Sequence, residues 1–85
     1  MRHVKVRHVS ALIEEIRITK RLPSPADARA LRIAAGVSLV RLAREVGVSG
    51  AALLAWEEGR YKPRGAHRAA YVRLLEELSR EVEIG

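Results

Sequence analysis

The three residues from Gly47 to Ser49 constrain the fold of this chain more than any other segment. The segments before and after them carry apolar side chains three and four residues apart, which is the spacing of one face of an α-helix. A connector this short, with a glycine in it, forces a sharp turn between two helices, and Val48 must then point inward. The sequence therefore predicts two short helices joined in a helix-turn-helix.

Serine and glycine residues mark where helices begin and end along the middle of the chain. A serine hydroxyl accepts hydrogen bonds from the backbone N–H groups of a first helical turn, and glycine favours the left-handed conformation that ends a helix. Pro25 is favourable at a first helical position, and Asp27 can complete a capping box with the preceding serine. The predicted starts and ends are Ser24 and Gly36, Ser38 and Gly47, and Ser49 and Gly59.

A further helix is expected on each side of these three. We predict that the first begins at Ser10 and that the last follows the polar loop 60–65. Their apolar faces consist of Leu12, Ile13 and Ile16 in the first helix, and of Tyr71, Leu74, Leu75, Leu78 and Val82 in the last. Residues 4–9 alternate with a period of two, which fits either a short edge strand or a basic arm.

The expected architecture is thus all-α, with five helices and a short basic arm before the first. We divide the chain into a basic arm with an accessory helix at residues 1–23 and a helix-turn-helix domain with a long C-terminal helix at residues 24–85. The length of 85 residues allows one hydrophobic core, and 48% apolar residues are too many for a disordered tail.

Two further features of the composition limit where the protein works. The absence of cysteine excludes a disulfide framework and a thiolate metal site, and it fits a reducing cytoplasm. No apolar run approaches the ~20 residues of a membrane span. We therefore expect a cytoplasmic protein without a membrane partner.

The positive charge of the chain is concentrated in two blocks. Basic residues dominate segments 1–24 and 60–73, whereas residues 25–59 are balanced and residues 76–83 are mainly acidic; the net charge is +6. Positive patches attract polyanions because contact releases condensed counterions. A solubilising surface is the alternative explanation. The charge pattern favours a nucleic-acid partner without deciding the matter.

Three motifs at fixed spacing carry a resemblance to a known family. They are Leu-Arg-x-x-x-Gly-Val-Ser at residues 31–38, Leu-Ala-x-x-Val-Gly-Val-Ser at 42–49, and Leu-x-x-Trp-Glu-x-Gly at 53–59, followed by Pro63. In this combination the chain resembles the Cro/repressor-type (XRE-like) helix-turn-helix family of DNA-binding regulators. The resemblance covers roughly residues 26–78, and the segment from Trp56 to Gly65 looks like that of small actinobacterial or phage regulators.

The resemblance implies a lambda-repressor-like domain that binds double-stranded DNA sequence-specifically and regulates transcription, as a repressor or a Cro-like protein. Helix 49–58 would be the recognition helix in the major groove, and Arg32 and Glu57 would form a buried ion pair. Such proteins bind as two-fold dimers, so we expect a weak homodimer or a dimer formed on DNA. The resemblance also implies a bacterial or phage-infected host cell and association with the nucleoid. Two unrelated surface charges remain the alternative for Arg32 and Glu57.

The positions that would contact DNA bases depart from what base recognition usually requires. The family's base-reading positions fall on Gly50, Ala51, Leu54 and Ala55, and Leu39 stands where the family usually has glutamine. None of these side chains can bond to base edges, although alanine and leucine can touch thymine methyl groups. We therefore expect affinity from phosphate contacts, with sequence read by DNA shape, methyl contacts or an arm.

The candidate phosphate contacts lie at helix starts and in basic segments. They are Ser38, Arg41, Arg44, Ser49, Arg60, Tyr61, Lys62 and Arg64. In addition Arg2, Lys5 and Arg7 could enter the minor groove as an arm, for which plain disorder is the alternative. Structural alternatives also exist for Arg44, which can pair with a neighbour on its helix, and for Tyr61, which can cover Trp56.

Nothing in the sequence indicates catalysis. The only aspartate is Asp27, and His3, His8 and His67 lie in different segments without metal-ligand spacing. We expect no enzymatic activity, cofactor, metal site or small-molecule substrate. The main alternative function is a protein-interaction adaptor, antitoxin-like or antirepressor-like, because exposed apolar side chains on the recognition helix often mark a protein contact.

Overall fold

The chain folds into five α-helices in the computed structural model, which describes the backbone of residues 2–84 and the side chains of residues 10–83. The helices are α1 (Arg2–Arg21), α2 (Pro25–Ala34), α3 (Leu39–Val46), α4 (Gly50–Glu57) and α5 (Gly65–Ile84). No strand occurs in the described backbone. The predicted all-α fold with five helices is confirmed.

Serine caps begin the three short helices as the sequence predicts. The Ser24 hydroxyl oxygen accepts a hydrogen bond from the backbone N–H of Asp27 at 3.1 Å. Ser38 and Ser49 begin α3 and α4 in the same way, also at 3.1 Å. Gly47 follows α3 with a φ of 92°, a conformation that suits glycine because it has no Cβ.

The turn between α3 and α4 is held by its own backbone and by the core. The Val48 N–H donates to the Ala43 carbonyl at 2.9 Å, and the Val48 side chain packs against the core. Buried side chains from α2 to α5 form this core: Ala28, Leu42, Ala43, Val46, Leu53, Trp56, Tyr71 and Leu75. The rings of Trp56 and Tyr71 lie 5.0 Å apart between centroids. The core thus fixes α4 relative to α3 and α5.

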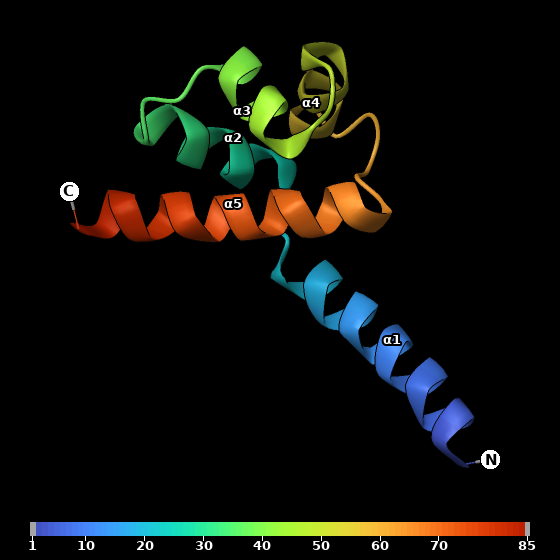
Figure 1. Cartoon of the computed structure of the whole chain (residues 1–85). Helices are drawn as coiled ribbons and strands as arrows, with labels where there is room; N and C mark the ends of the chain where they lie inside the picture. Colours follow the sequence, from blue (N-terminus) through green and yellow to red (C-terminus); the bar gives the residue numbers. More distant parts are fainter. Residues whose placement is uncertain (1, 85) are drawn as a thin grey trace.

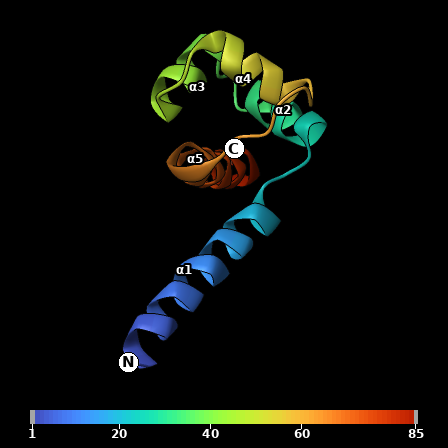
Figure 2. The ribbon, with the colours of Figure 1, turned by 90° about the vertical axis from the view of Figure 1, so that its right-hand side faces the viewer.

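The long helix α5 separates the helix-turn-helix from α1. In Figure 1, α2, α3 and α4 lie along one side of α5, and α1 leaves from the other side and extends away. Figure 2, turned by 90°, shows the same order, with α2 to α4 arching over α5. Arg21 at the end of α1 contacts Glu76 of α5 through two hydrogen bonds, of 2.8 and 3.1 Å.

The N-terminal segment differs from the sequence-based expectation. Helix α1 begins at Arg2 rather than at Ser10, so residues 4–9 form neither an edge strand nor an extended arm. A helix satisfies backbone hydrogen bonds within the segment, whereas a strand needs a neighbouring strand that the described backbone does not offer. The side chains of Arg2, Lys5 and Arg7, predicted to enter a minor groove, lie outside the described residues.

Two predicted apolar faces contain residues that are open to solvent. The stripe on α1 is open to solvent, with Leu12, Ile13 and Ile16 exposed by 57%, 38% and 43%. Val82, predicted for the buried face of α5, is also exposed, because the C-terminal end of α5 extends beyond the helices that cover its middle (Figure 1). Among the described residues, no helix combines the length and apolar character needed to cross a membrane.

Candidate nucleic-acid interface

Helix α4 presents one narrow face to solvent and buries the rest. Leu53 and Trp56 face the core, while Ala51 and Leu54 are exposed. Gly50 at the start of α4 is half-buried, and a Cβ built on it would lie 4.0 Å from the side chain of Val40 on α3. The exposed face of α4 is therefore short, and Val40 continues it onto α3.

Ala55 does not belong to this face, which corrects the sequence-based assignment. Its exposed fraction is only 4%. The chain after α4 turns back over it, since the N–H groups of Arg60 and Tyr61 both donate to the Ala55 carbonyl, at 2.9 and 3.4 Å. Sequence spacing placed Ala55 beside Leu54, but the path of the loop 58–64 removes it from the surface.

Arg32 and Glu57 lie together and connect α2 to the end of α4. Arg32 Nε and Nη2 donate to the two carboxylate oxygens of Glu57 at 2.7 and 3.0 Å, and Nη1 donates to the Val37 carbonyl at 3.0 Å. The side chains are 12% and 1% exposed. The hydrogen bond that Arg32 donates to Glu57 raises the pKa of Arg32 further above its usual value, against the effect of burial. Such a two-point contact fixes the orientation of α4.

The basic candidates fall into two groups by their partners. Arg41 donates to Glu45 at 3.3 Å, and Arg60 donates to Glu58 at 2.8 Å. The basic candidates that are exposed and have no acidic partner among the described residues are Arg44, Lys62 and Arg64. Helical neighbours thus neutralise Arg41, not Arg44 as the alternative explanation supposed.

Arg41 also differs from Arg44 in the direction it faces. With Glu45 it lines a groove against Leu74 and Leu78 of α5, on the side of α3 away from Val40. Arg44 lies four residues after Val40 and therefore on the flank of α3 that adjoins the start of α4. Arg44 is accordingly the better placed of the two to contact a ligand that covers α4.

The remaining polar candidates are available at the surface. The capping hydroxyls of Ser38 and Ser49 each accept a backbone hydrogen bond, which leaves their own hydrogen free to donate. Tyr61 is 68% exposed, so it extends into solvent rather than covering Trp56. Leu39 is half-buried and packs against the core, so it adds little to an exposed apolar surface.

Sequence reasoning missed two residues at this interface. Val40 is 59% exposed, and Glu58, the C-cap residue that directly follows α4, is exposed four residues after Leu54. The helical spacing carried the signal for both, because Val40 lies opposite the buried positions of α3 and Glu58 continues the exposed side of α4. No cluster of histidine and acidic side chains in the described part is suited to hold a metal ion, and His67 is exposed.

Comparison with known proteins agrees with this geometry. A family model described as "Helix-turn-helix" matches residues 29–81, which include α3, the turn, α4 and most of α5. No curated protein and no solved structure matched the chain. The match spans more than half of the chain and contains the motifs noted above. The chain therefore belongs to the Cro/repressor-type (XRE-like) helix-turn-helix family of DNA-binding proteins.

Proposed function

We propose that this protein binds double-stranded DNA sequence-specifically and regulates transcription, as a repressor or a Cro-like regulator without enzymatic activity. The observation that carries the proposal is the combination of an exposed face on α4 with unpaired cations beside it. Arg44 lies next to the start of α4, and Lys62 and Arg64 lie in the loop after its end. Cations at both ends of a helix that enters the major groove reach phosphates on either side of it.

The α4 face supports a particular way of reading the sequence. Ala51 and Leu54 provide only apolar contacts, and such contacts distinguish thymine by its methyl group. Glu58 is the one side chain on this face that can accept a hydrogen bond from a cytosine amino group, and Arg60 holds it at 2.8 Å. We therefore propose that most of the affinity comes from phosphates and that base preference is modest.

A salt titration of DNA affinity tests the phosphate contacts. We expect Arg44→Ala and Lys62→Ala to weaken binding to all duplexes by similar factors, and each to reduce the slope of log K against log salt by about one unit. Arg80→Ala is the matched control, because it removes the same charge from the end of α5 that lies away from α4 (Figure 1). Equal slopes for all three variants would refute the assigned contacts.

The role of α4 is tested by adding a hydrogen-bonding group to it. Ala51→Gln introduces a donor and an acceptor at an exposed position of the helix. We expect binding to random duplex to stay nearly unchanged and the sequence selected from a random library to shift. If the ratio of specific to random affinity is unchanged while Arg7→Ala abolishes it, the N-terminal segment reads the DNA and α4 does not.

An adaptor function is the second candidate, and the exposure of Val40 and Leu54 favours it. These two apolar side chains, on α3 and α4, are 59% and 38% exposed. A protein partner covers such a surface with apolar side chains of its own. Micromolar binding to random duplex that falls steeply with salt supports the DNA function; no binding at low salt supports the adaptor.

A second copy of the chain is the proposed partner on DNA. The apolar stripe of α1 is exposed and provides a surface for a weak dimer or for a dimer that forms on a palindromic site. Sedimentation of the protein, free and with a palindromic duplex, measures this directly. A monomer under both conditions contradicts the proposal, and Ile16→Glu should abolish any dimer that uses the stripe.

A further inference from the structure

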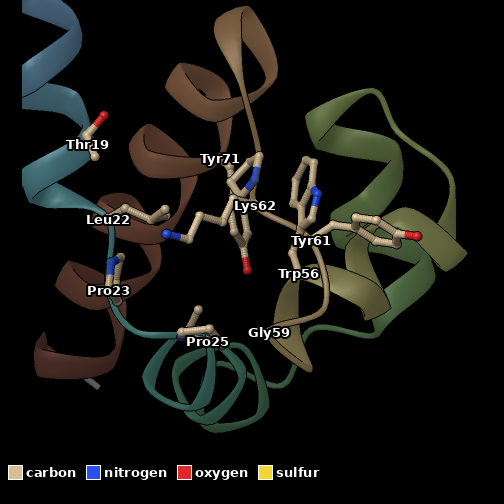
Figure 3. Close-up of a pocket in the computed structure, with 11 residues that line it drawn as sticks. Thr19, Leu22, Pro23, Pro25, Trp56, Gly59, Tyr61, Lys62 and Tyr71 are labelled. Carbon is tan, nitrogen blue, oxygen red and sulfur yellow. The ribbon is translucent and has the colours of Figure 1, made fainter.

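A pocket of about 260 Å³ lies where α1, the end of α4 and the start of α5 meet. Figure 3 shows it as an open space between the chain that links α1 to α2, the loop after α4, and α5. Most of its lining is apolar: Leu22, Pro23, Pro25, Ala28, Trp56 and Pro63. Its volume is below the ~300–1,000 Å³ that drug-sized ligands occupy. A molecule that fits it is therefore small and has an apolar body.

One buried polar group in this pocket has no partner. Tyr71 is only 2% exposed, and its hydroxyl makes no hydrogen bond among the described residues. Figure 3 shows this hydroxyl pointing into the space in front of Pro25 and Gly59. Burial is the main reason that the pKa of Tyr71 rises to about 12, so the hydroxyl keeps its proton and remains a donor. A buried donor without an acceptor destabilises the fold by itself, and an acceptor placed there removes the penalty.

The pocket has one cationic side chain. Lys62 lines it and has no acidic partner among the described residues. In Figure 3 its side chain crosses the pocket toward Leu22 rather than pointing away from it. An ammonium group offers three donors and a full positive charge. The polar features of the pocket are therefore donors from Tyr71 and Lys62, and the complementary ligand group is a small anionic acceptor.

We propose that this pocket binds a small aromatic or aliphatic monocarboxylate. Its carboxylate would lie between the Lys62 ammonium and the Tyr71 hydroxyl, and its apolar body against Trp56 and Pro25. One cation suits a single negative charge better than the double charge of a phosphate monoester. This goes beyond DNA binding, because the site lies under the loop that follows α4 and not on the exposed face of α4. Lys62 is common to both proposals: in the free chain its side chain crosses the pocket, and it must turn out of the pocket to reach a phosphate.

The chain provides its own reporter for this site. Trp56 is the only tryptophan, and it lines the pocket. We would titrate the full chain, without DNA, with phenylacetate and with phenylacetamide, its neutral counterpart of nearly the same shape. We expect saturable quenching of Trp56 by phenylacetate with a dissociation constant of about 1 mM or below. We expect the amide to bind at least about tenfold more weakly, because it lacks the charge that Lys62 complements.

Two variants and one control separate the pocket from nonspecific anion binding. Tyr71→Phe removes only the unpartnered hydroxyl, so it leaves the fold intact, and it should lower the affinity for phenylacetate about tenfold. Lys62→Met should lower this affinity by a similar factor and abolish the preference for phenylacetate over phenylacetamide. Arg64→Met removes the same charge from the same loop but does not line the pocket, and it should leave binding unchanged. Calorimetry repeats each titration independently of fluorescence.

The proposal is overturned by any of three results. These are equal binding of phenylacetate and phenylacetamide, binding of phenylacetate to Tyr71→Phe as tight as to the wild-type chain, and the absence of saturable binding up to about ten times the expected constant. Because DNA is absent from these titrations, their outcome is independent of whether the protein regulates transcription.

Discussion

Helices α2 to α5, called the domain below, bury a core of apolar side chains, whereas helix α1 leaves its apolar stripe exposed. In the domain, Leu42 and Leu53 are 2% and 0% exposed and lie among other buried side chains. On α1, Leu12 is 57% exposed, although the helix has the same length as α5. The difference shows that apolar spacing alone builds a helix but does not bury it. Burial requires neighbouring helices on that face.

The two bidentate Arg–Glu pairs show the same contrast in their electrostatics. Arg32 and Glu57 sit inside the domain with side chains 12% and 1% exposed, whereas Arg21 and Glu76 join α1 to α5 at 44% and 38% exposure. Both pairs have a shortest contact near 2.8 Å, at 2.7 and 2.8 Å. Water screens the outer pair, while the inner pair has lost its hydration and depends on its partner. Similar geometry therefore has different consequences for stability.

Truncating one leucine in each region should give the largest contrast. Leu53→Ala leaves a cavity in the core and should lower the free energy of unfolding by about 3–5 kcal/mol. Leu12→Ala, at an exposed position, should change it by less than ~0.5 kcal/mol. Urea denaturation followed by circular dichroism measures both. Equal losses would mean that α1 packs against the rest of the chain as closely as the core helices do.

Removing one carboxylate from each ion pair should give the next largest contrast. Glu57→Ala leaves the Arg32 guanidinium buried without its partner and should cost about 3 kcal/mol. Glu76→Ala should leave the melting temperature unchanged within error, since both members of that pair are exposed. A melting curve of Glu57→Ala that matches the wild type would contradict a structural role for the inner pair.

Alkaline pH should weaken the domain through Tyr71. Its pKa is raised from 10.0 to about 12 in the folded chain, so the unfolded chain loses this proton first as pH rises. The corresponding stability is present below pH 10 and lost toward pH 12, by up to about 2–3 kcal/mol. Urea denaturation at pH 9 and pH 11 should show this loss in the wild type and in Tyr61→Phe, which lacks an exposed hydroxyl. Tyr71→Phe should lose distinctly less.

Acid should release α1 before it affects the domain. The hydrogen bond from Arg21 lowers the pKa of Glu76, so the folded chain holds this carboxylate ionised more readily than the unfolded chain does. The contact is present at neutral pH. It is lost when the pH falls below the usual glutamate pKa and then through the lowered pKa of Glu76 in the folded chain. Hydrogen exchange should show reduced protection at the end of α1 at pH 3 relative to pH 6. Glu76→Gln should show the reduced protection at both pH 3 and pH 6.

Local sequence signals predicted the helices of the domain well and α1 less well. Serine caps and glycine ends fixed α2, α3 and α4 to within a residue or two, because capping involves neighbours three residues apart. At the N-terminus, alternation over residues 4–9 suggested a strand or an arm, and Ser10 suggested a helix start. Alternation over a few residues is weak evidence when no partner strand exists, and the helix extends back to Arg2.

For the candidate site, the sequence predicted which residues could take part, and the tertiary structure decided which of them are exposed at the interface. The family motif predicted an ion pair between Arg32 and Glu57, and in the folded chain Arg32 Nε lies 2.7 Å from Glu57 Oε2. Spacing could not show that the loop after α4 covers Ala55, nor that Arg41 turns toward Glu45 and α5. Both depend on the path of a loop and on a neighbouring helix, which a helical repeat does not describe.

By itself, the sequence determined that this chain forms five helices with a helix-turn-helix at Gly47 to Ser49, because caps, turn residues and apolar spacing act over three or four positions. Only the tertiary structure decided which surfaces remain open. The pocket at Tyr71 forms where the linker after α1 meets the loop at Lys62 and α5, and this linker is far from both of them along the chain. The Tyr71 hydroxyl has no partner among the side chains that enclose the pocket. Those side chains come together only in the folded chain, and no local sequence pattern connects them.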